Sequence, residues 1–415
     1  MSGDAPVNMP VSVMGFQPAP AKMFHKKSRT GCQLCRARRV KCNEAKPSCS
    51  HCARHRMPCL YDRNQETFES SRRSTDGPLW TSPAISTKVA EVNPRSNGSD
   101  GPPESKARRT LELRLLHQYM SKTGPAIAID DHSRSAWCEL IPLWSFRSEA
   151  LQYAMYSVAA LHIAKTDAFK DPIVIDAHQT YLEMALHEHS VEVSKLSRAN
   201  VDITCLTSSI FRICSFVMLQ HRSLCPYSPP MEWLRMTNSA ATIFKEAWRL
   251  ASDDEESIAA QLIRRLPIAL DTDARLGVDN RRDFLHLLHR KPSDELTEPW
   301  DKGIQEAYED TLSYIGGIWI AVNNHEATGD ICRRLVVFPM LAPPRFLDLV
   351  EELRPRALVI LMHYFALLSL LREFWYIGDG GEREVYAIKA ILVDEWRDFV
   401  SWPLDIMKTK IVITL

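Results

Sequence analysis

The pattern of hydrophobic and polar positions divides the chain into an irregular first part and a helical remainder. From residue 111 onward, apolar residues recur at the three- and four-residue spacing of amphipathic helices. Leu151, Met155 and Val158 fall on one face of such a helix, and Ser148 stands where an N-cap is expected. We predict helices over 149–165, 206–220, 232–251, 257–270, 304–322, 346–376 (interrupted near Pro355) and 382–399.

The composition of this helical region favours an all-α fold. Turn signals of the hairpin kind are few, and nine of the ten tryptophans lie after residue 110. The chain of 415 residues is 45% hydrophobic, which is enough to bury a large core. A region of roughly 300 residues built from short apolar helices is expected to form a bundle or a superhelical array.

Neither a membrane span nor a secretion signal is indicated. The longest nearly apolar stretch, Ala357–Leu371, is interrupted by His363 and Ser369, and it is shorter than the roughly 20 residues that a spanning helix needs. Residues 1–27 contain four prolines and no basic segment followed by an apolar one. The sequence therefore gives no reason to expect an oxidising compartment.

The segment between residues 62 and 110 has the composition of a linker. Ser, Pro, Thr, Gly and charged residues dominate it, and its few large apolar residues follow no heptad spacing, so no coiled coil is expected. The Lys106-Ala-Arg-Arg109 run is compatible with nuclear import, although a solvated end of the linker explains it equally well.

The formal net charge is zero, but the charges are distributed unevenly. Twelve basic and two acidic residues lie between residues 21 and 65, whereas 32 basic and 42 acidic residues follow residue 110. The first segment therefore carries +10 and the part after residue 110 carries −10. Such asymmetry indicates a small polyanion-binding module joined to a larger body that does not bind polyanions.

Six of the eleven cysteines fall within 28 residues, at positions 32, 35, 42, 49, 52 and 59. They form an internal repeat, because 32–42 and 49–59 each have the spacing C-x2-C-x6-C. A disulfide framework, a finger with one zinc ion and a binuclear zinc cluster are the three alternatives. Disulfides form in oxidising compartments, and nothing in the sequence directs the chain to one. A finger with one zinc ion does not require two matched triplets of cysteine. Two tetrahedral zinc ions need eight bonds, so six thiolates suffice only if two sulfurs bridge.

The run from Ser28 to Tyr61 resembles the fungal Zn2Cys6 binuclear-cluster transcription factors. All six cysteine positions and both basic runs match this family without an insertion, and Pro47 stands where the family also carries a proline. The resemblance implies two Zn2+ ions per chain, with Cys32 and Cys49 as bridging ligands. It further implies that one zinc site is completed by Cys35 and Cys42, and the other by Cys52 and Cys59.

Family members place the short helix after the first cysteine pair in the major groove, where they commonly read a CGG-type triplet. On this resemblance, Arg38, Arg39 and Lys41 are the candidates for base-edge or adjacent phosphate contacts, because such side chains donate to the O6 and N7 acceptors of guanine. Contacts with phosphate would make the affinity fall steeply with salt. The alternative for any one residue is a solvated surface charge. The candidates for backbone phosphate contacts are Lys26, Lys27, Arg29, Arg36, Arg54 and Arg56.

Most of residues 111–404 is similar to the regulatory region of fungal Zn2Cys6 factors, which include the sterol uptake control proteins. In the sterol regulators this region holds a lipid in an apolar helical pocket, and the residues alone do not decide whether this chain keeps one. Family members continue with further helix after the Trp-Pro-Leu element, whereas this chain ends eleven residues past Leu404, in a tail that looks neither helical nor amphipathic. We therefore expect a shortened domain or a misassigned gene boundary. The matching stretches are 227–236, 355–368, 375–379 and 401–404.

The remaining polar residues of the helical region are expected to be structural. His363 is interpreted as a core histidine. His187 and His189 point apart on a helix, so a metal site that joins them to His178 is not expected. No Gly-rich phosphate loop, nucleophile elbow or His-Glu zinc helix occurs, so no enzyme activity is expected. The cysteines expected to be small buried hydrophobes are Cys205, Cys214, Cys225 and Cys332.

The sequence thus predicts an all-α chain with a small N-terminal Zn2Cys6 cluster, made of two short helices and loops, and a large helical regulatory domain. The resemblance implies a nuclear, sequence-specific transcription factor of RNA polymerase II that regulates a biosynthetic gene cluster, such as one for a secondary metabolite. The alternatives are a lipid- or sterol-responsive regulator of sterol genes and a zinc-clasped interaction module that does not bind DNA. Double-stranded DNA is the expected partner, and no association with a membrane is expected. The sequence leaves open whether the chain forms a homodimer and whether the helical domain binds a small apolar ligand. The expected domains are a disordered N-terminus (1–24), the DNA-binding domain (25–63), a flexible linker (64–109) and the helical domain (110–415).

Overall fold

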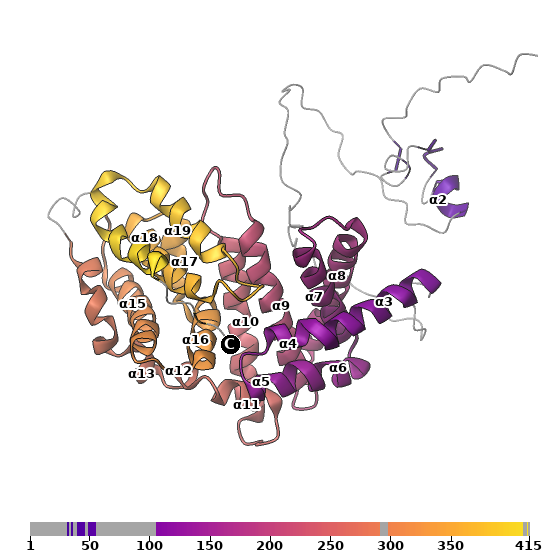
Figure 1. The fold of residues 1–415 in the computed structure, drawn as a ribbon, viewed down its shortest axis with the longest axis horizontal. Coiled ribbons are helices and arrows are strands. Elements are labelled where there is room, and N and C mark those ends of the chain that lie inside the picture. The colour runs from indigo at the N-terminus through magenta and orange to yellow at the C-terminus, as the bar shows by residue number, and fades with distance from the viewer. Residues whose placement is uncertain are drawn as a thin grey trace, which may run out of the picture. The chain divides into compact units, whose positions relative to one another are not determined.

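The computed structural model describes residues 31–32, 35, 40–45, 49–54, 105–290, 298–409 and 413. The chain forms two compact units, residues 1–77 and 78–415, and each is described by itself. Within the described residues, all regular secondary structure is helical and no strand occurs (Figure 1). This composition confirms the predicted all-α fold class.

In the first unit, helix α2 (Ser50–Arg54) is described, and Cys35 is also helical. The helical unit begins with α3 (Lys106–Gln118), η1 (Tyr119–Thr123), α4 (Gly124–Ile127), α5 (Asp131–Ser135), η2 (Ala136–Leu140), α6 (Ile141–Trp144), η3 (Ser145–Arg147), α7 (Glu149–Thr166), α8 (Pro172–Ser194), α9 (Val201–His221) and α10 (Met231–Ala251). It continues with α11 (Ile258–Arg264), α12 (Pro267–Leu270), α13 (Thr272–Leu276), η4 (Val278–Leu288), α15 (Lys302–Asn323), α16 (Thr328–Leu341), α17 (Pro344–Glu351), α18 (Pro355–Leu368), η5 (Ser369–Leu371), α19 (Gly380–Ile391), η6 (Asp394–Val400) and α20 (Ser401–Lys408).

Side-chain caps fix where several of these helices begin. Ser148 Oγ accepts a hydrogen bond from the Leu151 N–H at 3.1 Å, so α7 begins where the sequence predicted it. Asp301 Oδ1 likewise accepts from the Ile304 N–H at 2.8 Å at the start of α15. Each cap satisfies a backbone donor that the first turn of a helix leaves without an intrahelical partner.

Other boundaries differ from the prediction. Within the predicted helix 346–376, the expected interruption near Pro355 is confirmed, because α17 ends at Glu351 and α18 begins at Pro355, but α18 ends at Leu368 and the 3-10 turn η5 follows it. The predicted helix 257–270 breaks before Pro267, and 382–399 divides into α19 and the 3-10 segment η6. The helices α3, α8 and α16 were not predicted, and α3 begins at Lys106 inside the expected linker.

The expectation that the tail after Leu404 is not helical was wrong for its first part. Helix α20 runs through Asp405 to Lys408, and the Ile406 side chain on it is buried. Further on, the Ile413 N–H donates to the Leu370 carbonyl oxygen at 2.9 Å, and the Ile413 side chain is also buried. Both residues therefore belong to the core of the helical unit.

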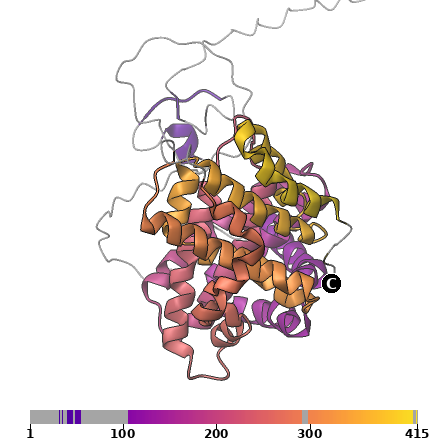
Figure 2. The ribbon, with the colours of Figure 1, turned by 90° about the vertical axis from the view of Figure 1, so that its left-hand side faces the viewer.

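The core is centred on α18, whose side chains are buried from Arg356 to Leu368. Helices α9 and α10 connect the earlier helices of the unit to the later ones. Helix α9 contacts α7 and α19, and α10 contacts α16 and α17. In Figure 1 these two central helices lie between α3–α8 on one side and α15–α19 on the other. Figure 2 shows the unit from the side of α15, with the orange and yellow helices in front.

Glycine permits one close contact that the fold needs. Helix α15 carries Gly316 where the backbone of η4 crosses it, and a Cβ there would lie 1.9 Å from the Asn280 carbonyl oxygen. No side chain fits at that distance, so only glycine lets η4 pack directly on α15. Asn280 in turn donates through Nδ2 to the Ala274 carbonyl oxygen at 2.8 Å and so holds the end of α13.

The stretch Trp375–Asp379 forms a junction with α7 and α9. Gln220 on α9 donates through Nε2 to the carbonyl oxygens of Trp375 and Tyr376, at 3.3 and 2.6 Å, and its Oε1 accepts from Lys165 Nζ on α7. Gly378 follows with a φ of +50°, and a Cβ at this residue would collide with the Gln220 side chain. One buried amide therefore joins three segments that are distant in sequence.

Among the described residues, one helix meets the length and composition of a membrane span. This helix is α9, and most of its apolar segment is buried inside the helical unit. The bent pair α17 and α18 passes the same test only if both helices are counted as one broken span.

Candidate metal centre and nucleic-acid interface

The second cysteine pair is arranged by the start of α2. Cys49 directly precedes this helix, and its carbonyl oxygen accepts from the Ala53 N–H at 2.8 Å. The Ser50 N–H donates to Asn43 Oδ1 at 2.8 Å, which ties the first turn to the segment after Cys42. Cys52 lies three residues after Cys49, so the C-x2-C spacing turns both sulfurs to the same side.

Four sulfurs converge in the first unit. The Sγ atoms of Cys32, Cys35, Cys42 and Cys49 all lie within 4.8 Å of one another, and all four side chains are buried. Among the described residues, these four cysteines form the group of potential ligands, drawn from His, Cys, Asp and Glu, that could hold a metal ion. Cys52 is buried with them.

The distances between these sulfurs suit tetrahedral zinc. Cys32 and Cys49 Sγ lie 3.8 Å apart, Cys35 and Cys49 Sγ 3.6 Å, and Cys32 and Cys52 Sγ 3.6 Å. With Zn–S bonds of about 2.3 Å, two sulfurs of one tetrahedron lie about 3.8 Å apart. The spacing is much longer than a disulfide bond of about 2.05 Å, so no disulfide joins these described cysteines to one another.

Two of the sulfurs reach across the repeat. Cys32 belongs to the first triplet and contacts Cys52 of the second, while Cys49 belongs to the second triplet and contacts Cys35 of the first. Cys32 and Cys49 also contact each other. Cys59, the sixth predicted ligand, lies outside the described residues.

Backbone N–H groups point at the sulfurs. The N–H groups of Cys32 and Glu44 donate to Cys42 Sγ at 3.5 and 3.4 Å, and that of Cys52 donates to Cys49 Sγ at 3.4 Å. Glu44 reaches Cys42 because its φ of 56° turns the chain back. Such donors favour thiolates and orient metal ligands. The sequence pattern did not single out Glu44.

A cation is required to keep several of these groups as thiolates at once. Burial, together with hydrogen bonds to Cys32 and Cys49, raises the pKa of the Cys35 thiol to about 12. A divalent ion offsets both the burial and the mutual repulsion of thiolates, because coordination deprotonates the sulfur. The soft donor set, its tetrahedral spacing and its exclusion from water therefore fit Zn2+.

Two predicted DNA-contacting residues are described. Lys41 is exposed beside the buried Cys42, and Arg54 is exposed at the end of α2. The Val40 N–H donates to the Cys35 carbonyl oxygen at 3.0 Å, which brings Lys41 close to the cysteine core. The other candidates, which lie outside the described residues, are Lys26, Lys27, Arg29, Arg36, Arg38, Arg39 and Arg56.

The histidines of the helical unit have separate structural partners. His178 Nδ1 lies 2.9 Å from Ser157 Oγ, His189 Nε2 lies 3.1 Å from Ser208 Oγ, and His187 is exposed. His363 is fully buried, and its ring stacks on Trp402 with the centroids 5.0 Å apart. These positions agree with the expected structural roles.

The cysteines outside the cluster match the expectation with one exception. Cys205, Cys214 and Cys332 are buried. Cys225 is exposed, so the prediction of a buried hydrophobe was wrong there. It lies in the irregular segment between α9 and α10, where no helical periodicity turns it towards the core.

Comparisons with known proteins agree with this geometry. Residues 30–67 match the fungal Zn(2)-Cys(6) binuclear cluster domain. The chain is 32% identical over 348 residues to the Zn(2)-C6 fungal-type transcription factor afumD of Aspergillus fumigatus, covering 83% of this chain and 86% of the relative. It is 25% identical over 445 residues to a Zn(2)-C6 fungal-type transcription factor of Gibberella zeae, covering 93% and 87%.

A third relative covers mainly the helical unit. The chain is 48% identical over 266 residues to Sterol uptake control protein 2 of Saccharomyces cerevisiae, which is 62% of this chain and 27% of that relative. The match over most of the length of afumD, together with the converging cysteines, defines the family. The chain belongs to the fungal Zn(2)-C6 transcription factors, DNA-binding regulators of transcription whose N-terminal cluster domain binds two zinc ions.

Proposed function

We propose that Cys32 and Cys49 bridge the two zinc ions. The first ion would be held by Cys32, Cys35, Cys42 and Cys49, the four sulfurs that already lie within 4.8 Å of one another. The second would be held by Cys32, Cys49, Cys52 and Cys59. The observation that carries this assignment is the pair of contacts across the repeat, Cys32 with Cys52 and Cys49 with Cys35, both at 3.6 Å.

The basic residues around the cluster are proposed to bind duplex DNA. Lys41 and Arg54 project into solvent from segments anchored by Cys42 and Cys52. A rigid cluster with exposed cations around it is suited to hold a fixed register on the phosphate backbone. Within this proposal Arg38, Arg39 and Lys41 read a CGG-type triplet. The phosphates are contacted by Lys26, Lys27, Arg29, Arg36, Arg54 and Arg56.

The decisive experiment compares the zinc-loaded full chain on a CGG-containing duplex and on a scrambled duplex of equal length. The Arg38→Ala/Arg39→Ala variant should lose the preference for CGG while retaining its zinc. The matched control replaces Arg282 and Arg397, two exposed arginines of the helical unit, by alanine. Equal binding of wild type to both duplexes would reject triplet recognition, and no binding to either would favour the zinc-clasped interaction module.

We further propose that the protein acts in the nucleus with RNA polymerase II and regulates a biosynthetic gene cluster, such as one for a secondary metabolite. The similarity to transcription factors along most of the chain supports a regulator of this layout. Transcript profiling of a deletion strain, beside genome-wide binding of a tagged protein, tests this. Loss of expression confined to one set of adjacent genes is the expected result, whereas unchanged expression of any such set would contradict it.

A sterol-responsive regulator is the second candidate, because the helical unit is similar to Sterol uptake control protein 2. The two cavities described in the helical unit have volumes of about 210 and 270 Å3. Both fall below the ~300 Å3 at which sites for drug-sized ligands begin. Neither of these two cavities would therefore enclose a whole sterol.

A further inference from the structure

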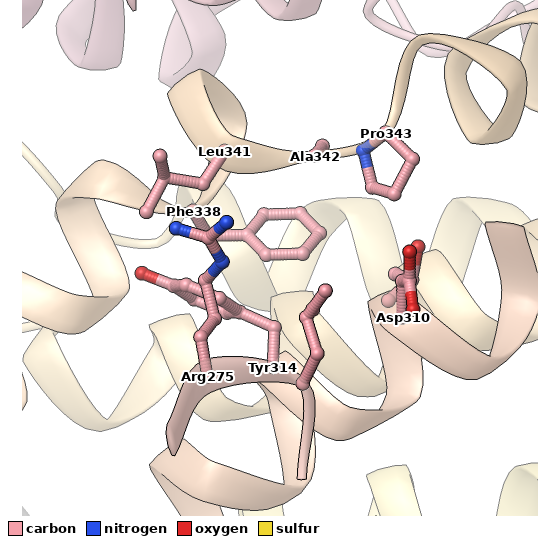
Figure 3. A pocket seen from close by; sticks show the side chains of 9 residues that line it. Arg275, Asp310, Tyr314, Phe338, Leu341, Ala342 and Pro343 are labelled. Atoms are coloured by element: carbon pink, nitrogen blue, oxygen red, sulfur yellow. The ribbon is translucent and has the colours of Figure 1, made fainter. Parts of the chain in front are cut away.

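The cavity of about 210 Å3 lies between α13, α15 and the end of α16. Figure 3 shows Arg275 and Asp310 on opposite sides of the Phe338 ring, with Tyr314 beneath the arginine in this view. Arg275 comes from α13, Asp310 and Tyr314 from α15, and Phe338 from α16. Three elements thus contribute opposite charges and apolar side chains to the lining of one small space, with the nearly buried rings of Tyr314 and Phe338 behind that lining.

The carboxylate in this cavity belongs to Asp310, which interacts with Arg281 and Arg275 through their charges. Asp310 is half-buried, and it makes no hydrogen bond or ion pair with any described residue. The nearby Arg281 is already engaged, since its guanidinium donates to Ser313 Oγ at 2.9 Å and to Glu309 at 2.7 Å. Desolvation raises the pKa of Asp310, and so do the neighbouring Glu306 and Glu309, whereas the positive charges of Arg281 and Arg275 lower it without reversing the shift. A partly desolvated carboxylate without a donor is a destabilising feature unless something binds it.

The guanidinium in the cavity has spare donors. Arg275 donates through Nη1 to the carbonyl oxygens of Ile268 and Ala269, both at 3.2 Å. A guanidinium has five N–H donors in a planar fork, so Nε and Nη2 keep donors for an anion. Among the described residues, no carboxylate forms an ion pair with Arg275.

The walls between the two charges are held in place by the fold. The Tyr314 hydroxyl donates to the Arg334 carbonyl oxygen at 2.9 Å, and the Phe338 ring stacks on Tyr364 with the centroids 4.0 Å apart. Asn238 Nδ2 donates to the Ala342 carbonyl oxygen at 3.1 Å and fixes the segment beside Pro343. The cavity is therefore largely preformed, which lowers the entropic cost of binding.

We propose that this cavity binds a small zwitterion that carries an apolar side group, such as an aromatic α-amino acid. Asp310 receives the ammonium group, Arg275 receives the carboxylate, and the partly exposed side chains of Leu276, Leu341 and Pro343 contact the apolar group. A charged group of one sign alone would leave the opposite side chain unpaired, so both charges are needed for full affinity. All the residues that line the cavity belong to the helical unit.

Calorimetry on the zinc-loaded full chain tests this with three probes: L-phenylalanine, 3-phenylpropionate and phenethylamine. Wild type should bind L-phenylalanine at least about tenfold more tightly than either probe that lacks one charge. Asp310→Asn should bind L-phenylalanine only as well as 3-phenylpropionate, and Arg275→Gln only as well as phenethylamine. Asp273→Asn is the matched control, because Asp273 is an exposed acid of α13 that does not line the cavity, and it should bind as wild type does.

Asp310→Asn is expected to fold, because the carboxylate it removes makes no hydrogen bond or ion pair with a described residue. Its thermal midpoint should equal or exceed that of wild type in the absence of probe, which separates loss of binding from loss of structure. No heat from any probe at about 1 mM would overturn the proposal. An unchanged affinity of Asp310→Asn for L-phenylalanine would overturn it as well.

Discussion

Arg356 and Glu298 form a buried bidentate ion pair that ties the segment before α15 to the start of the central helix α18. Arg356 Nε lies 3.0 Å from both carboxylate oxygens of Glu298, and Nη2 lies 2.8 Å from Oε2. The guanidinium also donates to the carbonyl oxygens of Leu287 and His289 and lies over the rings of Trp300 and Trp396. The side chains of both charged residues are less than a tenth exposed.

Removal of Glu298 alone should therefore be strongly destabilising. Glu298→Gln removes a buried carboxylate that pairs with the buried Arg356, which is expected to lower the free energy of unfolding by about 3–5 kcal/mol. Urea denaturation followed by far-ultraviolet circular dichroism measures this difference. Asp279→Asn breaks the exposed pair with Arg282 and should change stability by at most about 1 kcal/mol. Equal effects of the two substitutions would mean that burial of the Arg356 pair has no energetic consequence.

The close contact at Gly316 predicts opposite effects for two neighbouring glycines. Gly316→Ala places a Cβ against the Asn280 backbone and should lower the free energy of unfolding by about 1–3 kcal/mol through overpacking. Gly317→Ala is the control, since the nearest atom to its Cβ lies at an ordinary 3.5 Å. That substitution should stabilise α15 by up to about 1 kcal/mol, because alanine favours helix over glycine. Thermal unfolding of both variants tests the contrast, which a loss of stability in both would contradict.

The proposed bridging role of Cys49 predicts how much zinc each cysteine variant retains. Cys52→Ser leaves the four ligands of the first site intact, so about one equivalent of zinc should remain. Cys49→Ser removes a ligand from both sites and should leave well under one equivalent. Elemental analysis of the reconstituted full chain measures this. Cys225→Ser, at an exposed cysteine outside the cluster, should keep both ions. Retention of one equivalent by Cys49→Ser would argue against bridging.

The contact between Asp130 and Arg333 predicts a pH dependence. Desolvation raises the pKa of Asp130, but hydrogen bonds from Ser133 and Arg333 outweigh it and lower the pKa from 3.8 to about 2. Because the pKa is lower in the folded chain, the carboxylate stabilises the fold above about pH 4 and loses this effect as the pH falls towards 2.

Asp130→Asn should be less stable than wild type at neutral pH, and the gap should narrow between about pH 4 and pH 2. Urea midpoints across this range are the appropriate measurement. Asp131→Asn, an exposed neighbour on α5, serves as the control and should follow wild type at every pH. A gap of constant size would show that Asp130 acts through packing and not through its charge.

Arg54 offers a test of phosphate binding at a residue whose exposure is established. Arg54→Ala should weaken binding to CGG and scrambled duplexes by the same factor, and it should reduce the slope of log affinity against log salt by about 1. Arg397→Ala, an exposed arginine of the helical unit, should leave the slope unchanged. Filter binding at several salt concentrations provides the slopes. A loss confined to the CGG duplex would instead assign Arg54 to base recognition.

The parts of the structure that follow from local rules were predictable. The cap at Ser148 and the apolar positions behind it located α7 to within one residue at its end. Helix α8 has comparable signals, since Asp171 is its N-cap and Pro172 is its first residue. Its outward face is polar, however, and this obscures the spacing of its apolar positions in the sequence. The cysteine spacing predicted the converging sulfurs because two residues within one turn must share a side.

Features that depend on tertiary contacts could not be predicted in this way. The Gly316 contact exists only because η4 crosses α15, and nothing near Gly316 in the sequence points to Asn280. Arg275 and Asp310 are 35 residues apart and meet at one cavity only after α13 and α15 have packed. The exposure of Cys225 could not be predicted either. A cysteine in an irregular segment has no helical periodicity around it that would show whether its side chain faces the core or the solvent.

The hydrogen bonds of Gln220 bear on how genetic screens of this protein should be interpreted. Alleles that change Gln220, Gly378 or Lys165 would loosen the junction of α7, α9 and the Trp375–Asp379 stretch, and the protein would be degraded before it reached a promoter. Such alleles would resemble defects in signal perception in a reporter assay. Immunoblots of protein abundance, taken beside reporter output, separate the two classes.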